Sequence, residues 1–117
     1  MQDLKLRTKK FAVDCWRLCS KIPKTRELDA WVGQLIRCSS SVGANYRAAC
    51  RAKSDRDFIN KLKIVEEELD ETMYFIELIV ELEPSSKDTW RKLYEECLEV
   101  LKIIVSTLKT TRSKLKK

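Results

Sequence analysis

Apolar residues recur at intervals of three and four along most of the chain, which is the spacing that predicts amphipathic helices. Four segments show this pattern, at residues 3–21, 28–52, 55–83 and 87–111. The sequence contains no stretch in which apolar and polar residues alternate, as they would in a half-buried strand. The pattern therefore predicts one all-α domain over residues 1–117, in which residues 112–117 form a basic tail that frays.

The segments between the predicted helices carry signals that end one helix or begin the next. Pro23 and Pro84 end the first and third helices, because proline disfavours helical geometry in the residue before it. Ser54, with Asp57 three residues later, resembles a capping box at the start of the third helix. Because connections this short make neighbouring helices antiparallel, we expect an up-down-up-down four-helix bundle.

The most regular apolar positions define the expected core. They are Trp31, Leu35, Val42, Leu62, Leu69, Ile76, Leu93, Ile104 and Leu108. Asn45 lies on the same stripe of the second helix, where a buried amide needs a partner. We predict that it bonds to the first helix, the third helix or the opposing backbone. The small residues at 39–44 are poor helix formers, which predicts that another helix packs closely against them.

The candidate residues for binding a soft metal ion or for redox chemistry are the five cysteines: Cys15, Cys19, Cys38, Cys50 and Cys97. Their number is odd, no CxxC spacing occurs and the chain has no histidine. We interpret them as reduced core residues of a cytosolic protein. The alternative is a zinc site on Cys15 and Cys19, which would need further thiolates from other helices. We expect no metal and no cofactor.

Several classes of protein are disfavoured by what the sequence lacks. Without histidine, the commonest acid–base group at neutral pH is missing, and no glycine-rich phosphate loop is present. A di-iron bundle would require Glu-x-x-His pairs on facing helices. We therefore expect a protein that is not an enzyme and has no catalytic residues. No secretory signal pattern or apolar run of membrane-spanning length occurs, so we expect a cytoplasmic protein that does not contact a membrane.

Charge is distributed unevenly along the chain, whose net charge is +6. Residues 1–63 carry fifteen Lys/Arg and six Asp/Glu. Residues 64–108 carry four Lys/Arg and twelve Asp/Glu, and residues 109–117 add five Lys/Arg. Antiparallel packing would gather at one end the cations of both termini and of the turn between the second and third helices. The N-terminal cations are Lys5, Arg7, Lys9 and Lys10. The candidate nucleic-acid-binding residues at the turn are Arg47, Arg51, Lys53, Arg56, Lys61 and Lys63.

A cluster of cations at one end is the electrostatic pattern of a protein that binds a polyanion. Two other interpretations remain open. The charges can simply solvate the helix ends, or the acidic segment of one subunit can dock on the basic segment of another. No zinc finger, helix-turn-helix or base-stacking sheet is evident, so contacts to phosphate would dominate any binding of RNA or DNA.

The third and fourth helices carry more apolar residues than one buried stripe needs. A second stripe on the third helix includes Ile64, Phe75, Leu78 and Leu82, and the fourth helix adds Leu98, Val100, Ile103 and Val105 outside its main stripe. A helix that is apolar on two sides is normally buried on two sides. We take Phe75, Leu78, Leu82 and Ile103 as candidate oligomer-interface residues. The alternative is a wide buried face in a monomer.

The run Ser-Val-Gly-Ala-Asn-Tyr-Arg at 41–47, with Asp-Phe-Ile-Asn-Lys-Leu-Lys-Ile at 57–64 and Glu-Glu-Leu-Asp-Glu-Thr at 67–72, resembles the bacterial four helix bundle protein family. That family is known from reading frames inside the intervening sequences of 23S rRNA genes. The resemblance covers residues 11–83, and the fold is also similar to that of accessory variability proteins of diversity-generating retroelements. Where the family commonly has glutamate this chain has Ala48, so no carboxylate stands there to pair with Arg51 or Lys53.

The resemblance implies an up-down bundle that assembles into a ring-like homopentamer. In the retroelement relatives a basic surface engages RNA and a reverse transcriptase. Two functional hypotheses follow for this chain. The first is an oligomer that binds structured RNA, or another nucleic acid, through the basic end. The second is a protein-interaction module, such as an accessory protein of a reverse transcriptase, whose charges pair between subunits.

Overall fold

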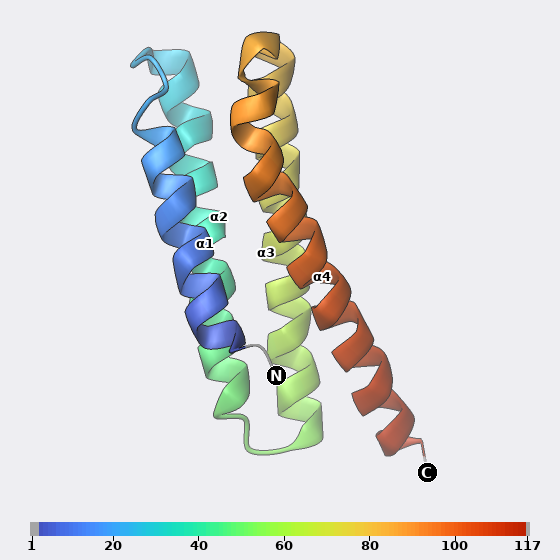
Figure 1. Cartoon of the computed structure of the whole chain (residues 1–117). Coiled ribbons are helices and arrows are strands. Elements are labelled where there is room, and N and C mark those ends of the chain that lie inside the picture. The colour runs from blue at the N-terminus through green and yellow to red at the C-terminus, as the bar shows by residue number, and fades with distance from the viewer. Residues whose placement is uncertain (1–2, 117) are drawn as a thin grey trace.

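The computed structural model describes residues 3–116 and contains four long helices. They are α1 (Leu4–Cys19), α2 (Arg26–Cys50), α3 (Asp55–Leu82) and α4 (Lys87–Leu115), with a 3₁₀ turn at Pro84–Ser86 before α4. The helices run alternately up and down in a molecule of 51 × 22 × 21 Å (Figure 1). The predicted all-α up-down bundle is therefore confirmed.

The helix starts follow from side chains that accept hydrogen bonds from the first backbone amides. Thr25 Oγ1 accepts a hydrogen bond of 3.1 Å from the amide of Leu28, so α2 begins two residues earlier than its apolar pattern suggests. Ser54 Oγ accepts one of 3.1 Å from the amide of Asp57. The Asp57 carboxylate in turn accepts a hydrogen bond of 3.1 Å from the Lys53 amide, one residue before the position of a standard capping box.

The C-terminal segment differs from the prediction of a fraying tail. Helix α4 continues to Leu115 rather than ending near residue 111. Thr111 is buried, and its hydroxyl donates a hydrogen bond of 2.9 Å to the carbonyl of Thr107. No glycine or proline interrupts the segment, and Arg112 and Lys114 in the last turn interact favourably with the helix dipole. The tail is therefore a helical arm, called the C-terminal arm below (residues 109–116).

Eight of the nine predicted core residues are buried, but Trp31 is only half-buried. Trp31 lies in the second turn of α2, close to the start of that helix. A bundle covers side chains less completely near its ends than at its middle. Val100 shows the opposite difference, because it is 1% exposed although its position lies beside the main stripe of α4. The core is therefore wider on α4, and shorter on α2, than the spacing of apolar residues indicates.

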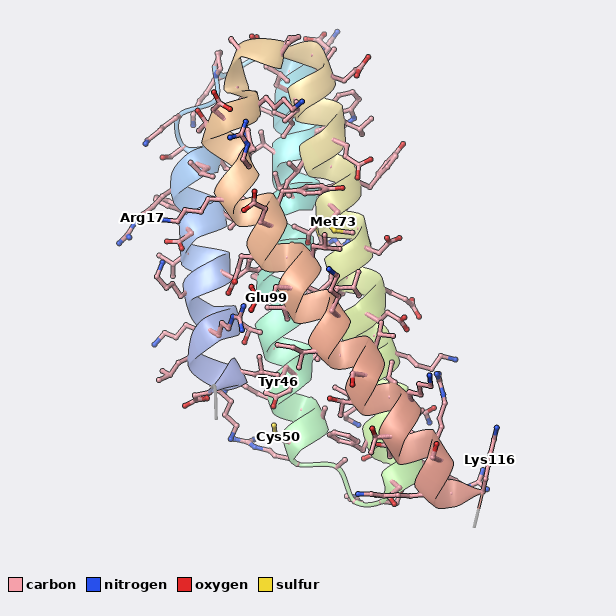
Figure 2. All side chains as sticks on the ribbon, turned by 45° about the vertical axis from the view of Figure 1, so that its right-hand side comes forward. Arg17, Tyr46, Cys50, Met73, Glu99 and Lys116 are labelled. Atoms are coloured by element: carbon pink, nitrogen blue, oxygen red, sulfur yellow. The ribbon has the colours of Figure 1, made fainter. Side chains whose placement is uncertain are left out.

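The prediction that the cysteines are core residues is confirmed for four of the five. Cys15, Cys19, Cys38 and Cys97 are buried, whereas Cys50 is exposed at the last residue of α2 (Figure 2). Burial raises the pKa of Cys38 to about 11, so this thiol stays protonated at neutral pH. Within residues 3–116, no group of three or more histidine, cysteine or acidic side chains is placed to hold a metal ion.

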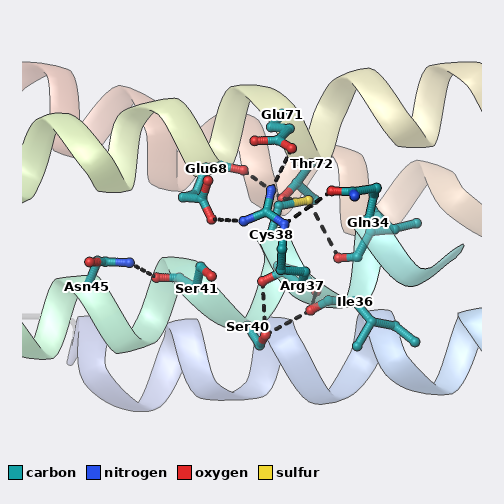
Figure 3. A network of polar contacts seen from close by, with 12 residues as sticks. Gln34, Ile36, Arg37, Cys38, Ser40, Ser41, Asn45, Glu68, Glu71 and Thr72 are labelled. Carbon is teal, nitrogen blue, oxygen red and sulfur yellow. Dashed lines mark hydrogen bonds and ion pairs between the residues drawn. The ribbon is translucent and has the colours of Figure 1, made fainter. Parts of the chain in front are cut away.

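Asn45 satisfies its amide within its own helix, so the predicted bond to another helix is wrong. Its Nδ2 donates a hydrogen bond of 2.9 Å to the carbonyl of Ser41, one turn earlier (Figure 3). The side chain is only half-buried. The short asparagine side chain readily bonds to the backbone of its own helix, here to the carbonyl one turn back.

The small residues in the middle of α2 allow α1 to approach closely, as the sequence predicts. A Cβ atom placed on Gly43 would lie 3.1 Å from Thr8 Oγ1. Thr8 is itself buried, and its hydroxyl donates a hydrogen bond of 2.6 Å to the carbonyl of Leu4. A side chain at position 43 would therefore press against Thr8, so the close approach of α1 favours glycine here despite its low helix propensity.

Candidate nucleic-acid interface

Five cations around the turn between α2 and α3 are exposed to solvent: Arg47, Arg51, Lys53, Arg56 and Lys63. Arg47 and Arg51 are one turn apart near the end of α2, and Arg56 and Lys63 are two turns apart at the start of α3, so each pair shares a helix face. None of the five side chains forms an ion pair with another residue in the described range 3–116. Their charges are therefore directed to solvent.

Lys61, the sixth candidate, is placed differently from the other five. It is half-buried, and its Nζ lies 2.9 Å from an oxygen of Asp57 one turn earlier. The Lys61 ammonium, together with the backbone amide of Lys53, lowers the pKa of Asp57 below its ordinary value. Lys61 thus supports the first turns of α3, and its charge is already matched by a carboxylate.

The C-terminal arm adds cations at the same end of the bundle. Lys109, Arg112, Lys114 and Lys116 are exposed. Lys109 and Arg112 lie on one face of α4, and Lys116 is the C-cap residue of that helix. Figure 1 shows the start of α1, the turn between α2 and α3 and the end of α4 at one end of the molecule, with α4 leaning away from the other helices. These cations are evident from the sequence, but the continuation of α4 that carries them is not.

The N-terminal cations contribute less than their number suggests. Arg7 of α1 is only 15% exposed and binds two carboxylates of α4, with Nε 2.6 Å from Glu96 and an Nη 2.8 Å from Glu99. These carboxylates raise the pKa of the Arg7 guanidinium. Lys10 lies 2.6 Å from an oxygen of Asp14. Arg7 therefore joins α1 to α4, a role that its place in a basic run of sequence does not reveal.

A second cross-helix ion pair explains part of the acidic cluster on α3. Arg37 of α2 reaches Glu68 at 3.0 Å and Glu71 at 2.5 Å, and its Nε donates to Gln34 at 3.1 Å (Figure 3). Glu68 is only 12% exposed. Two acids of the acidic segment at residues 64–108 are thus paired with α2, and the contact fixes the register between α2 and α3.

The candidate oligomer-interface residues are covered to different extents. Phe75, Leu78 and Ile103 are half-buried, and Phe75 packs against the core of its own chain. Leu82 is 56% exposed. Exposed apolar side chains also remain at Ile64, Leu98 and Val105. The second stripe of α3 is therefore partly buried within the monomer, and Leu82 has the largest exposed fraction of the four candidates.

The fold and this site define a class: an α-helical bundle with exposed, unmatched cations at one end. In the part of the chain that the structure describes, no helix is long and apolar enough to cross a membrane. Residues 3–106 match the family described as 23S rRNA-intervening sequence protein. Because this match spans most of the sequence, the chain belongs to that family.

A solved structure of similar fold comes from Bacteroides thetaiotaomicron VPI-5482 and is described as a protein with unknown function from the S23 ribosomal protein family. It is 30% identical to this chain, with a TM-score of 0.81. The similarity covers 92% of this chain and 99% of the other. The search of curated proteins gives no match.

Proposed function

We propose that this chain is a non-enzymatic binding protein that contacts structured RNA, or another nucleic acid, through the basic end. The basic end is Arg47, Arg51, Lys53, Arg56 and Lys63 together with the cations of the C-terminal arm. The observation that carries the proposal is that these side chains are exposed and the five at the turn lack carboxylate partners within residues 3–116. Unmatched cations are free to replace the counterions of a phosphate backbone.

The proposed binding depends on phosphate contacts rather than on reading bases. The basic end presents long, flexible side chains on helix surfaces. The aromatic side chains beside it, Tyr46 and Phe58, pack against the core, which limits the surface on which a base could stack. Affinity should therefore fall as salt rises, and it should vary little with nucleotide sequence. In an assembly of several copies the basic end is repeated, so modest affinity per subunit would be multiplied by avidity.

The test is a salt titration of binding to a fluorescently labelled stem-loop RNA. The double variant Arg47→Glu with Arg51→Glu should bind more weakly and should flatten the slope of log affinity against log salt by about 1.4–1.8 units, since each lost phosphate contact removes about 0.7–0.9. Circular dichroism checks that the variant remains helical.

A matched control separates a local effect from a change in net charge. Lys21→Glu with Lys24→Glu makes the same change at the opposite end of the bundle, near the turn between α1 and α2, where both lysines are exposed. This variant should keep most of the wild-type affinity and slope. Equal loss in both variants, or no loss in the first, would contradict the proposed interface.

The second candidate function is a protein-interaction module, such as an accessory protein of a reverse transcriptase, that acts as a homo-oligomer. The apolar side chains left exposed at Ile64, Leu82, Leu98 and Val105 favour it, because such residues commonly become buried when subunits associate. A homopentamer is the assembly that we propose. This candidate requires no binding to RNA at physiological salt.

Leu82→Asp tests the apolar stripe as a subunit contact. The side chain is 56% exposed at the last residue of α3, so the substitution should leave the fold intact. If the stripe is buried between copies, a charge there should lower the mass that light scattering reports at micromolar concentration toward 13.7 kDa. Glu83→Lys, at the next position, which is also exposed, is the control. A mass unchanged by Leu82→Asp would exclude Leu82 from the contact.

A further inference from the structure

A hollow of about 490 Å³ lies between α3 and α4 at the end of the bundle opposite to the basic end. Its apolar lining comes from Ile76 and Val80 on α3 and from Trp90 and Tyr94 on α4. Ile76 and Trp90 are buried, whereas Val80 and Tyr94 are half-buried and present surface to the hollow. The hollow is therefore a shallow apolar groove that can accept a side chain from outside.

The rim of this groove is acidic. Glu77, Glu81 and Glu95 line it and are exposed. Glu77 accepts a hydrogen bond of 2.7 Å from the hydroxyl of Tyr94, which raises the pKa of Tyr94 to about 12. Glu81 and Glu95 form no ion pair with another residue in the range 3–116. An occupant of the groove should therefore be apolar at its centre and positively charged around it.

The rim also contains two cations, but they do not cancel the acids. Arg91 is paired with Asp88 on its own helix. Lys87 is the other cation and forms no ion pair within residues 3–116. The rim therefore carries three carboxylates and one ammonium that is not paired with a carboxylate. A phosphate backbone would be repelled here, which makes nucleic acid an unsuitable occupant.

The C-terminal arm has the complementary chemistry. Leu115, the last residue of α4, is 42% exposed. Arg112 and Lys114 lie in the last turn of the helix, and Lys116 follows Leu115 as the C-cap residue. Figures 1 and 2 show this end of α4 leaning away from the rest of the bundle, so the side chains around Leu115 are accessible to another molecule. One apolar side chain flanked by cations is the shape and charge that the groove requires.

A chain cannot place its own arm in its own groove. The groove is at one end of a molecule 51 Å long, and the arm is at the other end of the same helix bundle. Helix α4 connects the two without a break. A contact between them must therefore join two copies.

We propose that the acidic groove between α3 and α4 of one copy receives the C-terminal arm of a second copy, with Leu115 over Val80 and Tyr94 and with Arg112 and Lys116 beside Glu81 and Glu95. The two surfaces differ, so the contact is head-to-tail, and its repetition builds a closed ring or an open filament. The arm cations also belong to the basic end, so a docked arm would leave RNA contacts mainly to the cations of the turn between α2 and α3. Association is measured without RNA, so this inference and the proposed function can fail separately.

Two charge-reversed variants test the contact. The groove variant is Glu81→Lys with Glu95→Lys, and the arm variant is Arg112→Glu with Lys116→Glu. All four residues are exposed, so circular dichroism should report an unchanged fold. Each variant should associate about tenfold more weakly than the wild type in sedimentation experiments, because attraction at two positions becomes repulsion.

Mixing the two variants distinguishes docking from a general effect of charge. In the mixture, the basic arm of the groove variant meets the acidic groove of the arm variant, and the acidic arm meets the basic groove. The average mass should therefore rise well above that of either variant alone at the same total concentration. An odd-numbered ring would not be fully restored, because two variants cannot alternate around it. Lys21→Glu with Lys24→Glu, which changes the charge by the same amount as the arm variant, should keep the wild-type mass throughout.

Three results would overturn the inference. One is a wild-type chain that stays monomeric at all concentrations, which would leave the groove to another occupant. Another is that the groove variant or the arm variant, measured alone, has the same average mass as the wild type. The third is a loss of mass that mixing fails to reduce, because that would place the effect outside the contact between arm and groove. Salt should weaken wild-type association, since the contact is partly electrostatic.

Discussion

Leu69→Ala is expected to lower the free energy of unfolding by about 2–5 kcal/mol, the range for removing a large aliphatic side chain from a core. Leu69 is fully buried on α3. The carbonyl of the same residue accepts a hydrogen bond of 3.3 Å from the Cys97 thiol of α4, which fixes the backbone around the site. A site held from two helices collapses little around a smaller side chain, so most of the cavity should remain.

The measurement is urea denaturation followed by circular dichroism. Domains of this size have total stabilities of about 5–15 kcal/mol, so the loss should be a large fraction of the total. The denaturant midpoint should move while the slope stays the same. Ile64→Ala on the same helix, where the side chain is 42% exposed, is the control and should cost less than about 1 kcal/mol. Equal effects at the two positions would contradict the assigned core.

Gly43→Leu is expected to destabilise the bundle by about 1–3 kcal/mol, the usual cost of forcing extra methylenes into a packed contact. Even a single Cβ at Gly43 would lie 3.1 Å from Thr8 Oγ1, and a leucine side chain would extend further into α1. Thr8 cannot move aside easily, because it is buried and hydrogen-bonded to the carbonyl of Leu4. The substitution should therefore separate α1 from α2.

Gly33→Ala provides a control of opposite sign in the same helix. A Cβ at Gly33 meets no atom within 4 Å. Alanine there should therefore stabilise the protein by about 0.5–1 kcal/mol, through the higher helix propensity of alanine alone. Thermal unfolding of both variants beside the wild type checks the pair. A neutral or stabilising Gly43→Leu would show that α1 and α2 can move apart without cost.

Gly33 and Gly43 illustrate which helix contacts can be predicted from the sequence and which cannot. Both lie within α2 and look alike in the pattern of residues, yet Gly43 faces α1 and Gly33 faces solvent. The run of small residues around Gly43 does predict close packing. Which neighbour supplies the contact depends on helices that are distant in sequence, so it could not be predicted from local spacing.

Ion pairs across helices were the least predictable part of the candidate site. Arg7 belongs to a basic run and Glu68 to an acidic run, and nothing local distinguishes them from their exposed neighbours. Their partners, Glu96 and Arg37, are reached only when α4 lies beside α1 and α3 beside α2. Net charge by segment therefore overestimates the charge that is available to a ligand.

The all-α class, the three turns and most of the core follow from the amino-acid sequence, because helix periodicity, proline and capping residues act within a few positions of each other. The tertiary structure was needed for facts that depend on which surfaces meet. It shows that Lys61 is paired with Asp57, while Arg47 and Arg51 form no ion pair within residues 3–116. It also shows that α4 remains helical to Leu115 and that a groove with an acidic rim lies at the end of the bundle opposite to the basic end. Such facts arise from the angle and register at which four helices pack, and residues far apart in the sequence set that packing jointly.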